Sequence, residues 1–321
     1  MLARCWLRRG ASGICRTVAS RRLLSSSAAR GESASNSPTA ALCIIGDEIL
    51  NGKTLDINSY FFAKRCFGLG VEVEKIEVVP DKYSAIAGSV QQLSRSHDIV
   101  FTSGGIGPTH DDITYSAVAQ AFGSKIAYHA DTLARMRRIM ASRGATTMPD
   151  PYGTPEQVAT ARMALFPADA TVVYPCSDYW VPVVCAAGNV HMLPGIPKLF
   201  EDLLDAYLPG LVARLSGEAA QAFTRALVGT RQRESAIAPI LTRLQERYAP
   251  RGVKIGSYPD WIPSRNTPSD VPVDWKPLVV VSAVGKNKKQ VAACREELRQ
   301  LLDGVDLGTS EPAANAGGEQ V

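Results

Sequence analysis

A glycine-rich segment that ends in two carboxylates is the part of the chain best suited to chemistry. It runs from Ser103 to Asp112, with the sequence SGGIGPTHDD, and contains Gly104, Gly105 and Gly107. Glycine lets backbone N–H groups approach an anion closely. The start of a following helix would add unpaired N–H groups and a partial positive charge. The segment therefore predicts a phosphate-binding loop, although it matches neither the Walker motif nor GxGxxG.

Two acidic pairs accompany this loop. Asp111 and Asp112 end it, and Asp47 and Glu48 follow an earlier apolar run. The first pair can cap the next helix, or at least one of its carboxylates can face the phosphates. A carboxylate beside a phosphate is repelled, so the second interpretation requires a divalent cation between them. Because all four side chains are oxygen ligands, we expect them to bind Mg²⁺, Mn²⁺ or Co²⁺ rather than a structural zinc.

The elements that would position these groups are strands alternating with helices. Residues 40–45 and 98–103 are largely apolar runs that favour parallel strands buried on both faces. Between them, 56–67 and 83–94 have helical spacing, and 71–79 alternates like a strand. The alternation predicts a mostly parallel sheet with ligands beyond the carboxyl ends of its strands. The acidic pairs converge there if the strands are neighbours.

The rest of the chain continues the α/β pattern. We expect further helices at 113–122, 129–143, 157–166, 198–208, 234–247 and 288–302, and strands at 171–175, 181–186, 190–193, 223–229, 253–257 and 278–284. Residues 40–212 are therefore predicted to form the phosphate-binding domain, and residues 220–304 a separate small α/β domain. The tail 305–321 is rich in Gly, Ala and Glu and is expected to be disordered.

The composition excludes some classes of partner. The chain has 321 residues, of which 45% are hydrophobic and 21% are charged, as in a globular protein of about two folding units. Residues 1–30 hold seven arginines and no acid, so the remainder has 35 − 7 = 28 basic residues against 31 acidic ones. We therefore expect no nucleic-acid partner. No apolar run is long enough to span a membrane.

The same arginines mark the amino-terminal segment. Its serines and its interspersed Leu, Trp and Val are typical of a mitochondrial transit peptide. We therefore expect residues 1–35 to be a presequence and linker that direct the chain to the mitochondrial matrix. The alternative is a basic tail without a targeting role. The cysteines form no CxxC pair, which argues against a disulfide framework or a zinc site.

Several long motifs occur in a characteristic order. They are IGDEILNG at 45–52, DIN at 56–58, TSGGIGPTHDDIT at 102–114, NVHMLPGIP at 189–197 and KIGSYP at 254–259. Together they resemble the MoaB/Mog molybdopterin-binding domain, in the form found in bacterial CinA and in the amino-terminal half of eukaryotic FAD synthase. The resemblance implies a three-layer α/β sandwich that binds a phosphorylated nucleotide or pterin. It also implies a homo-oligomer, either a dimer or a trimer.

The resemblance also suggests roles for single residues. Asp112 matches an aspartate that serves metal-dependent adenylyl transfer in the superfamily's transferases, and Asp111 stands where those transferases carry Arg. The expected catalytic residues are therefore Asp112 and Asp111, and the expected metal ligands are Asp47, Glu48, Asp111 and Asp112. The expected ligand-binding residues are Gly104, Gly105, Gly107, Thr109, Asn58 and Ser103.

The departure at Asp111 bears on function. It favours the CinA-like branch, which is associated with metal-dependent hydrolysis of nucleotide pyrophosphates such as FAD and ADP-ribose. The expected function is such a hydrolysis. A molybdopterin adenylyltransferase and a non-catalytic nucleotide- or pterin-binding module remain alternatives. Two further polar residues have open roles: His110 as an acid or base, and Asn189 either in fixing the turn before Pro194 or in touching ligand.

Overall fold

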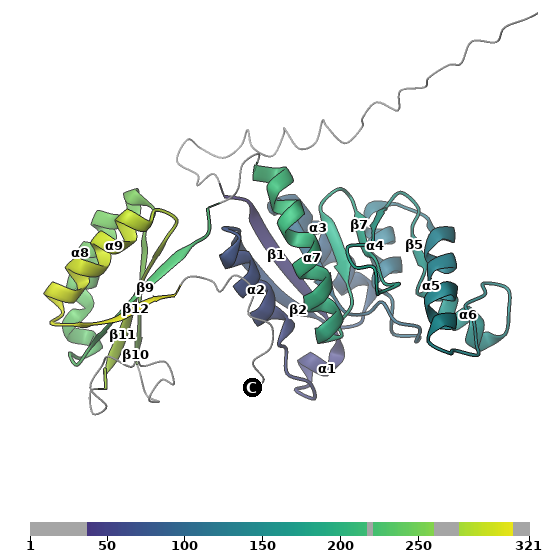
Figure 1. Cartoon of the computed structure of the whole chain (residues 1–321), viewed down its shortest axis with the longest axis horizontal. Coiled ribbons are helices and arrows are strands. Elements are labelled where there is room, and N and C mark those ends of the chain that lie inside the picture. Colours follow the sequence, from purple (N-terminus) through teal and green to yellow (C-terminus); the bar gives the residue numbers. More distant parts are fainter. Residues whose placement is uncertain (1–36, 217–220, 260–275, 311–321) are drawn as a thin grey trace, which may run out of the picture. The chain divides into compact units, whose positions relative to one another are not determined.

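A six-stranded sheet forms the centre of the larger domain in the computed structural model, which describes residues 37–216, 221–259 and 276–310 (Figure 1). The strand order is β2-β1-β3-β8-β7-β6. These strands are β1 (Thr39–Ile45), β2 (Glu72–Val79), β3 (Ile99–Ser103), β6 (Thr171–Val173), β7 (Val183–Ala186) and β8 (Val190–Leu193). The first four in spatial order run parallel, and β7 and β6 are antiparallel to their neighbours.

The apolar sequence of β1 reflects its central position. Every residue of β1 is buried, and the strand pairs with β2 on one side and with β3 on the other. Alternate residues enter two separate cores: Cys43 lies in one, and Leu42 and Ile44 lie in the other. A strand covered on both faces has no solvent side, which is why its apolar run is continuous. The predicted three-layer sandwich is confirmed.

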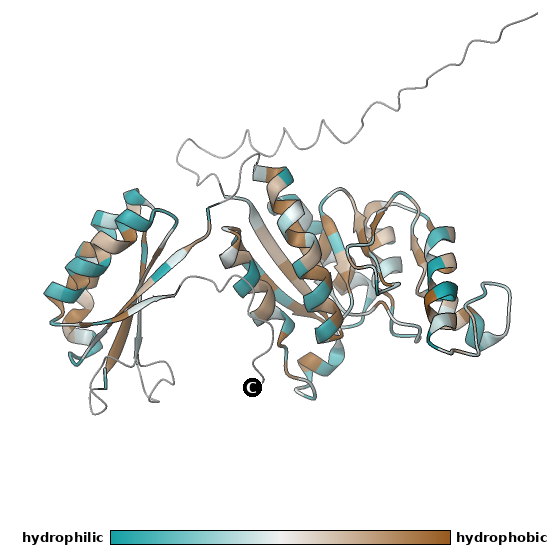
Figure 2. Ribbon diagram, in the orientation of Figure 1, coloured by the Kyte–Doolittle hydropathy of each residue, from teal (hydrophilic) through white to brown (hydrophobic). Residues whose placement is uncertain are grey.

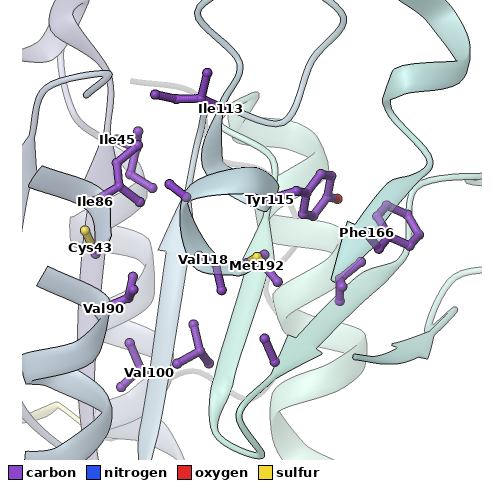
Figure 3. Close-up of a cluster of buried hydrophobic side chains, with 14 of the residues drawn as sticks. Cys43, Ile45, Ile86, Val90, Val100, Ile113, Tyr115, Val118, Phe166 and Met192 are labelled. Atoms are coloured by element: carbon purple, nitrogen blue, oxygen red, sulfur yellow. The ribbon is translucent and has the colours of Figure 1, made fainter. Parts of the chain in front are cut away.

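One face of the sheet is covered by α3 (Tyr83–Ser96), α4 (Thr114–Phe122) and α5 (Ala130–Ser142). Figure 3 shows Ile86 and Val118 in this core, and Tyr115, which packs edge-on against Phe166 with ring centroids 4.8 Å apart. The other face is covered by α2 (Asn58–Gly68) and α7 (Pro197–Ser216), with Phe62 and Phe200 fully buried. Both layers follow the helical spacing of apolar residues in the sequence.

The expected boundaries need correction in two places. Helix α6 (Pro155–Arg162) ends earlier than expected, because Leu165–Pro167 forms β5 and pairs with β4 (Ile126–Tyr128). Strands of three residues leave too little periodicity to predict from sequence. Helix α7 is longer than expected and continues through Pro209, because Leu211 and Val212 extend its buried stripe. The short α1 (Asp47–Leu50) follows β1 directly.

The smaller domain is an antiparallel sheet in the order β10-β11-β9-β12, packed with two helices. Its elements are β9 (Thr224–Thr230), α8 (Glu234–Tyr248), the 3-10 turn η3 (Ala249–Arg251), β10 (Lys254–Pro259), β11 (Val279–Gly285), α9 (Lys288–Leu301) and β12 (Val305–Ser310). In Figure 2, α8 and α9 carry both hydrophilic and hydrophobic residues. Their apolar residues, such as Ile237 and Leu298, enter the core with Val281.

The carboxyl-terminal prediction is partly wrong. Val305–Ser310 is not disordered but forms β12, which pairs with β9. Main-chain hydrogen bonds to a sheet edge make this strand, so its weakly apolar composition gave no signal. The predicted transit peptide and the rest of the tail lie outside the described residues. Among the described helices, none is both long and apolar enough to cross a membrane.

Candidate functional site

The carboxyl ends of β1, β2, β3 and β8 lie at one edge of the sheet, because these strands are parallel neighbours. The turn after β8 touches the glycine loop after β3. Gly104 N donates to Leu193 O at 3.2 Å, and a Cβ on Gly195 would lie 3.2 Å from Gly104 Cα. Strand β1 pairs directly with β3, and a Cβ on Gly104 would lie 2.2 Å from Ile45 O, so the predicted convergence of the loops after the first and third strands is confirmed.

Two positions in the loop require glycine. Gly104 has φ 109° and Gly105 has φ 63°. A Cβ on Gly104 would lie 2.2 Å from Ile45 O, and one on Gly105 would lie 2.3 Å from Thr114 Oγ1. Thr114, the first residue of α4, holds both glycines: its Oγ1 and its N donate to the carbonyls of Gly104 and Gly105, each at 2.9 Å. The loop conformation is therefore set before any ligand binds.

This conformation leaves donors unused. Within the described residues, no protein acceptor takes a hydrogen bond from the N–H groups of Gly105, Ile106 and Gly107. Successive unpaired N–H groups form an anion-binding concavity. The geometry therefore agrees with a phosphate-binding loop.

Asp112 folds back onto the loop. Its Oδ2 accepts from Thr109 N at 2.9 Å, and a Cβ on Gly107 would lie 2.7 Å from the same oxygen. Arg162, at the end of α6, donates to Thr109 O at 2.9 Å and to Asp112 O at 3.1 Å. Neither acidic residue caps α4, whose start has no side-chain cap. Sequence patterns gave no signal for Arg162, because it reaches the loop only through the tertiary fold.

Asp111 lies on the outer side of the loop and is exposed. Its Oδ1 is 2.5 Å from Thr109 Oγ1, and this hydrogen bond is the main cause that lowers the pKa of Asp111. His110 is 98% exposed, with its Nδ1 4.0 Å from Asp111 Oδ1. Asp111 therefore stays ionised at neutral pH and is available to a ligand.

Asp81 is a site residue that the sequence patterns missed. It follows β2, and its Oδ2 accepts from Asp47 N at 2.9 Å. Partial burial raises the pKa of Asp81; the Asp47 N–H opposes this shift, and the charges of Asp47, Glu48 and Asp111 reinforce it. Acids from the ends of three neighbouring strands thus interact electrostatically. Asp81 could have been found from the sequence, because it lies just after the predicted strand 71–79.

These carboxylates suit a hard divalent cation by chemistry. Among the described residues, however, no group of three or more His, Cys, Asp or Glu side chains is arranged to hold a metal ion. The predicted ligands Asp47, Glu48, Asp111 and Asp112 therefore do not form a complete metal site by themselves. The metal remains a prediction.

A pocket lies beside the glycine loop. Asn58, in the first turn of α2, donates from Nδ2 to Ser103 Oγ at 3.0 Å and to Gly195 O at 2.9 Å. Asp56 starts this helix by accepting from Ser59 N at 3.0 Å, as expected of a cap. The pocket is lined by Ile44, Ile45, Glu48, Ile49, Thr54, Leu55, Asp56, Ile57, Asn58, Ser103, Gly195 and Pro197.

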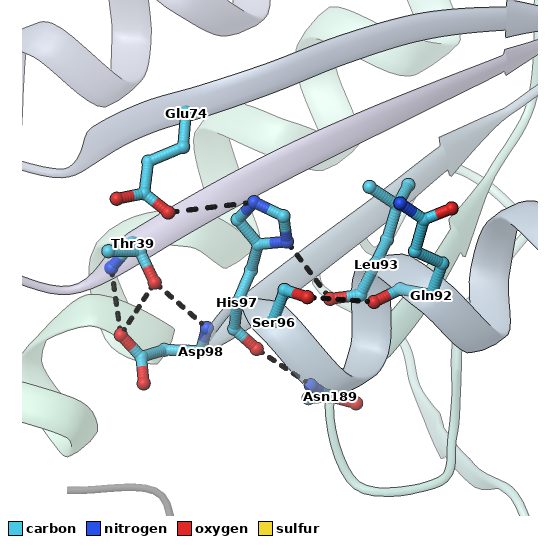
Figure 4. Close-up of polar contacts among 8 residues, drawn as sticks. All are labelled: Thr39, Glu74, Gln92, Leu93, Ser96, His97, Asp98 and Asn189. Atoms are coloured by element: carbon cyan, nitrogen blue, oxygen red, sulfur yellow. Dashed lines mark hydrogen bonds and ion pairs between the residues drawn. The ribbon is translucent and has the colours of Figure 1, made fainter. Parts of the chain in front are cut away.

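Asn189 belongs to neither the turn nor the site. It lies at the opposite end of the sheet, where its Nδ2 donates to Ser94 O at 2.9 Å. The same Nδ2 donates to His97 O at 3.0 Å (Figure 4). Both roles considered for it are therefore wrong. It ties the end of α3 to the start of β8.

Two models of known protein families match the chain, one over each of its two domains. The family model described as "probable molybdopterin binding domain" matches residues 41–213, and the model of the FAD synthase middle domain matches residues 222–307. The chain belongs to the molybdopterin-binding domain family. Membership implies a small-molecule ligand.

Curated relatives in this family differ in length. A "Probable FAD synthase" of Caenorhabditis elegans is 34% identical over 235 residues, which are 69% of this chain and 44% of the relative. A CinA-like protein of Geobacter metallireducens is 31% identical over 182 residues, 56% of this chain and 41% of the relative. The chain thus spans less than half of each of these relatives.

A protein of Aeropyrum pernix is similar over almost its whole length. It is 30% identical over 277 residues, which are 85% of this chain and 94% of that protein. Among solved structures, the CinA protein of Thermoplasma acidophilum is 28% identical and covers 56% of this chain and 100% of its own, with a TM-score of 0.47.

Proposed function

We propose that this molybdopterin-binding-family chain is a divalent-metal-dependent hydrolase of nucleotide pyrophosphates of the FAD or ADP-ribose type. The observation that carries the proposal is the pairing of unused N–H groups at Gly105–Gly107 with interacting acids from three neighbouring strands. The first group suits phosphate oxygens, and the second suits the cation that accompanies them. The similarity to FAD synthases and CinA-like proteins supports a nucleotide substrate.

Two sets of groups have different proposed roles: backbone N–H groups bind the phosphates, and carboxylates bind the cation. The N–H groups of Gly105, Ile106 and Gly107 would hold the phosphoryl oxygens and stabilise charge that develops on them. Asp47, Glu48, Asp111 and Asp112 would share the cation, with Asp81 beside them and substrate phosphates completing its ligands, as is usual for magnesium. A cation held there supplies Lewis acidity and a more acidic bound water.

Asp112 is proposed as the catalytic carboxylate. Its hydrogen bond from Thr109 N holds the loop and fixes the carboxylate beside Gly107. This position is next to the N–H groups that would bind the reacting phosphate. Arg162 is a positioning residue, because it contacts only backbone carbonyls of the loop.

Asp111 supports hydrolysis over adenylyl transfer. Transfer to molybdopterin brings a second anionic phosphate to the loop, whereas hydrolysis brings a neutral water. An arginine at this position would attract the second anion, whereas Asp111 offers an ionised carboxylate to the cation.

The test is AMP release by the full chain. FAD and ADP-ribose are incubated with Mg²⁺, Mn²⁺ or Co²⁺, or with EDTA, and products are separated by chromatography. We expect AMP with at least one metal and none with EDTA. The absence of AMP from both substrates with every metal would refute the proposal. The variant Asp112→Asn should release much less AMP. Its matched control is Asp131→Asn, because Asp131 is an exposed aspartate in the first turn of α5.

We also propose that residues 1–35 direct the chain to the mitochondrial matrix and that the protein forms a homo-oligomer. Expression of residues 1–35 fused to a fluorescent protein tests the first point, and a cytosolic signal would contradict it. Light scattering on the purified chain tests the second, and a monomer mass would contradict it.

A further inference from the structure

The orientation of the Asn58 side-chain amide is fixed by its neighbours. Nδ2 lies 2.9 Å from Gly195 O and 3.0 Å from Ser103 Oγ. A backbone carbonyl can only accept, so the nitrogen and not the oxygen must face Gly195. Ser103 Oγ in turn lies 3.3 Å from Pro194 O, to which it donates its single proton. Ser103 therefore accepts from Asn58, and both protons of Nδ2 are used.

The other end of this amide has no partner. Asn58 is 7% exposed, and its Oδ1 is buried without a hydrogen bond among the described residues. A buried carbonyl oxygen without a donor is destabilising and is rare in folded proteins. Asn58 lines the pocket, but Oδ1 itself has almost no solvent-exposed surface, so a bound molecule supplies the donor only when the side chains over this oxygen shift. That donor must be an N–H or O–H group.

The remaining lining is mainly apolar. Aliphatic side chains from the end of β1, from α1 and from the segment before α2 form its walls: Ile44, Ile45, Ile49, Leu55 and Ile57. Leu55 is 82% exposed and Ile57 is 43% exposed, so this apolar surface continues outward to the solvent. Such walls suit the faces of a flat ring, and one buried acceptor suits a donor on its edge.

The charges in the pocket place the phosphates elsewhere. Asp56 lines it, and its carboxylate would repel a phosphate there. Ser103 forms part of the pocket, and the next residue, Gly104, begins the loop with the unused N–H groups. A ligand can therefore place a ring in the pocket and its phosphates on the loop.

We propose that the pocket beside Asn58 is a ring subsite, in which a planar heteroaromatic ring donates an N–H to Asn58 Oδ1 while its phosphates lie on the glycine loop. This inference rests on the proposed function for the position of the phosphates, but not on hydrolysis. Two rings of an FAD-type substrate carry such a donor: adenine with its 6-amino group, and the flavin ring with its N3–H.

Two ligand pairs test the subsite by calorimetry on the full chain, in the presence of Mg²⁺. AMP is compared with purine riboside 5′-monophosphate, which lacks only the 6-amino group. FMN is compared with N3-methyl-FMN. We expect the parent ligand of at least one pair to bind about tenfold or more tightly than its analogue, because the analogue leaves Oδ1 unpaired. The pair that discriminates identifies the ring.

Variants tie this preference to one atom. Asn58→Leu removes Oδ1 and should reduce the preference to about onefold. Asn189→Leu is the matched control, since it removes a partly buried asparagine at the opposite end of the sheet. Circular dichroism checks that each variant folds. If Asn58→Leu does not fold, the comparison of the ligand pairs on the wild-type chain decides whether the ring subsite exists.

The outcomes separate the two proposals. Equal binding within both pairs, no binding of any probe, or a preference that survives in folded Asn58→Leu would overturn the ring subsite. None of these results depends on turnover. AMP release from FAD without discrimination would therefore overturn only the ring subsite. Discrimination without AMP release would overturn only the hydrolase.

Discussion

The two ends of the large sheet contrast in how their polar groups are used. At the amino ends of the strands, Asp98 Oδ2 accepts from both N and Oγ1 of Thr39, each at 2.9 Å, and Asn189 binds two carbonyls (Figure 4). At the carboxyl ends, Asn58 Oδ1 has no hydrogen-bond partner among the described residues, and the charges of Asp47, Glu48 and Asp111 act on Asp81. The polar groups named at the amino ends are paired within the chain, whereas those at the carboxyl ends are the ones proposed to meet a ligand.

This contrast suggests that polar groups at the amino ends of the strands contribute to stability, whereas those at the carboxyl ends contribute to ligand binding. Buried polar groups stabilise a fold when they are fully paired, and unpaired groups destabilise it. One unpaired buried oxygen, Asn58 Oδ1, and the interacting acids lie at the edge where parallel sheets bind ligands. Substitutions at the two ends should therefore affect different quantities.

The largest expected effect comes from Gly104→Ala. A Cβ there would lie 2.2 Å from Ile45 O, so the loop must move, and AMP release should fall by roughly 100-fold or more. Gly188→Ala is the control: Gly188 also has a positive φ, of 84°, but it precedes the amino end of β8 and a Cβ there meets nothing within 4 Å. Equal losses in both variants would remove the contrast between the two ends.

The next effect compares two aspartates. Asp112→Asn should lower kcat for AMP release by roughly 100-fold, because it removes one of the carboxylates proposed to hold the cation beside the reacting phosphate. Asp98→Asn should leave kcat unchanged and lower the Tm by several degrees, because it weakens hydrogen bonds to a charged group that contribute about 1.5–3 kcal/mol. Wild-type turnover by Asp112→Asn would refute its catalytic role.

A smaller effect is expected for Asp81→Asn. The pKa of Asp81 is raised in the folded protein, so its stabilising contribution is present only at acidic pH and is lost as the pH rises through that pKa. At neutral pH the ionised carboxylate is destabilising. Asparagine can still accept from Asp47 N, and without metal it should raise the Tm by roughly 1–2 °C.

Metal addition sharpens this comparison. If Asp81 helps to hold a cation, Mn²⁺ should raise the Tm of the wild-type chain more than that of Asp81→Asn. Calorimetric scans with Mn²⁺ and with EDTA measure both shifts. An unchanged metal response would exclude Asp81 from the cation site.

The smallest effect is expected for His110→Ala. Its ring is 98% exposed and only approaches Asp111, so kcat should change by less than about twofold. The pH profile of AMP release should also keep its shape. A large loss, or a missing limb in the profile, would make His110 an acid or base of the reaction.

Much of the fold could be predicted because its signals are local. The apolar runs of β1 and β3 and the glycines after β3 are contiguous in sequence, and each follows from the burial or backbone conformation of its own segment. Strands β4, β5 and β12 were missed, because their partners supply the hydrogen bonds that define them. Short strands without alternation carry no such local signal.

The sequence by itself determined a glycine-rich loop with acids at the carboxyl edge of a parallel sheet, because glycine conformations and the burial of a strand depend on neighbouring residues. Only the tertiary structure decided which groups stay unpaired there. Asn58 meets Gly195 across 137 positions of the chain, and Arg162 reaches Thr109 across 53. Whether a polar atom has a partner depends on such distant contacts, so the unpartnered oxygen of Asn58 and the inward turn of Asp112 appear only in the folded molecule.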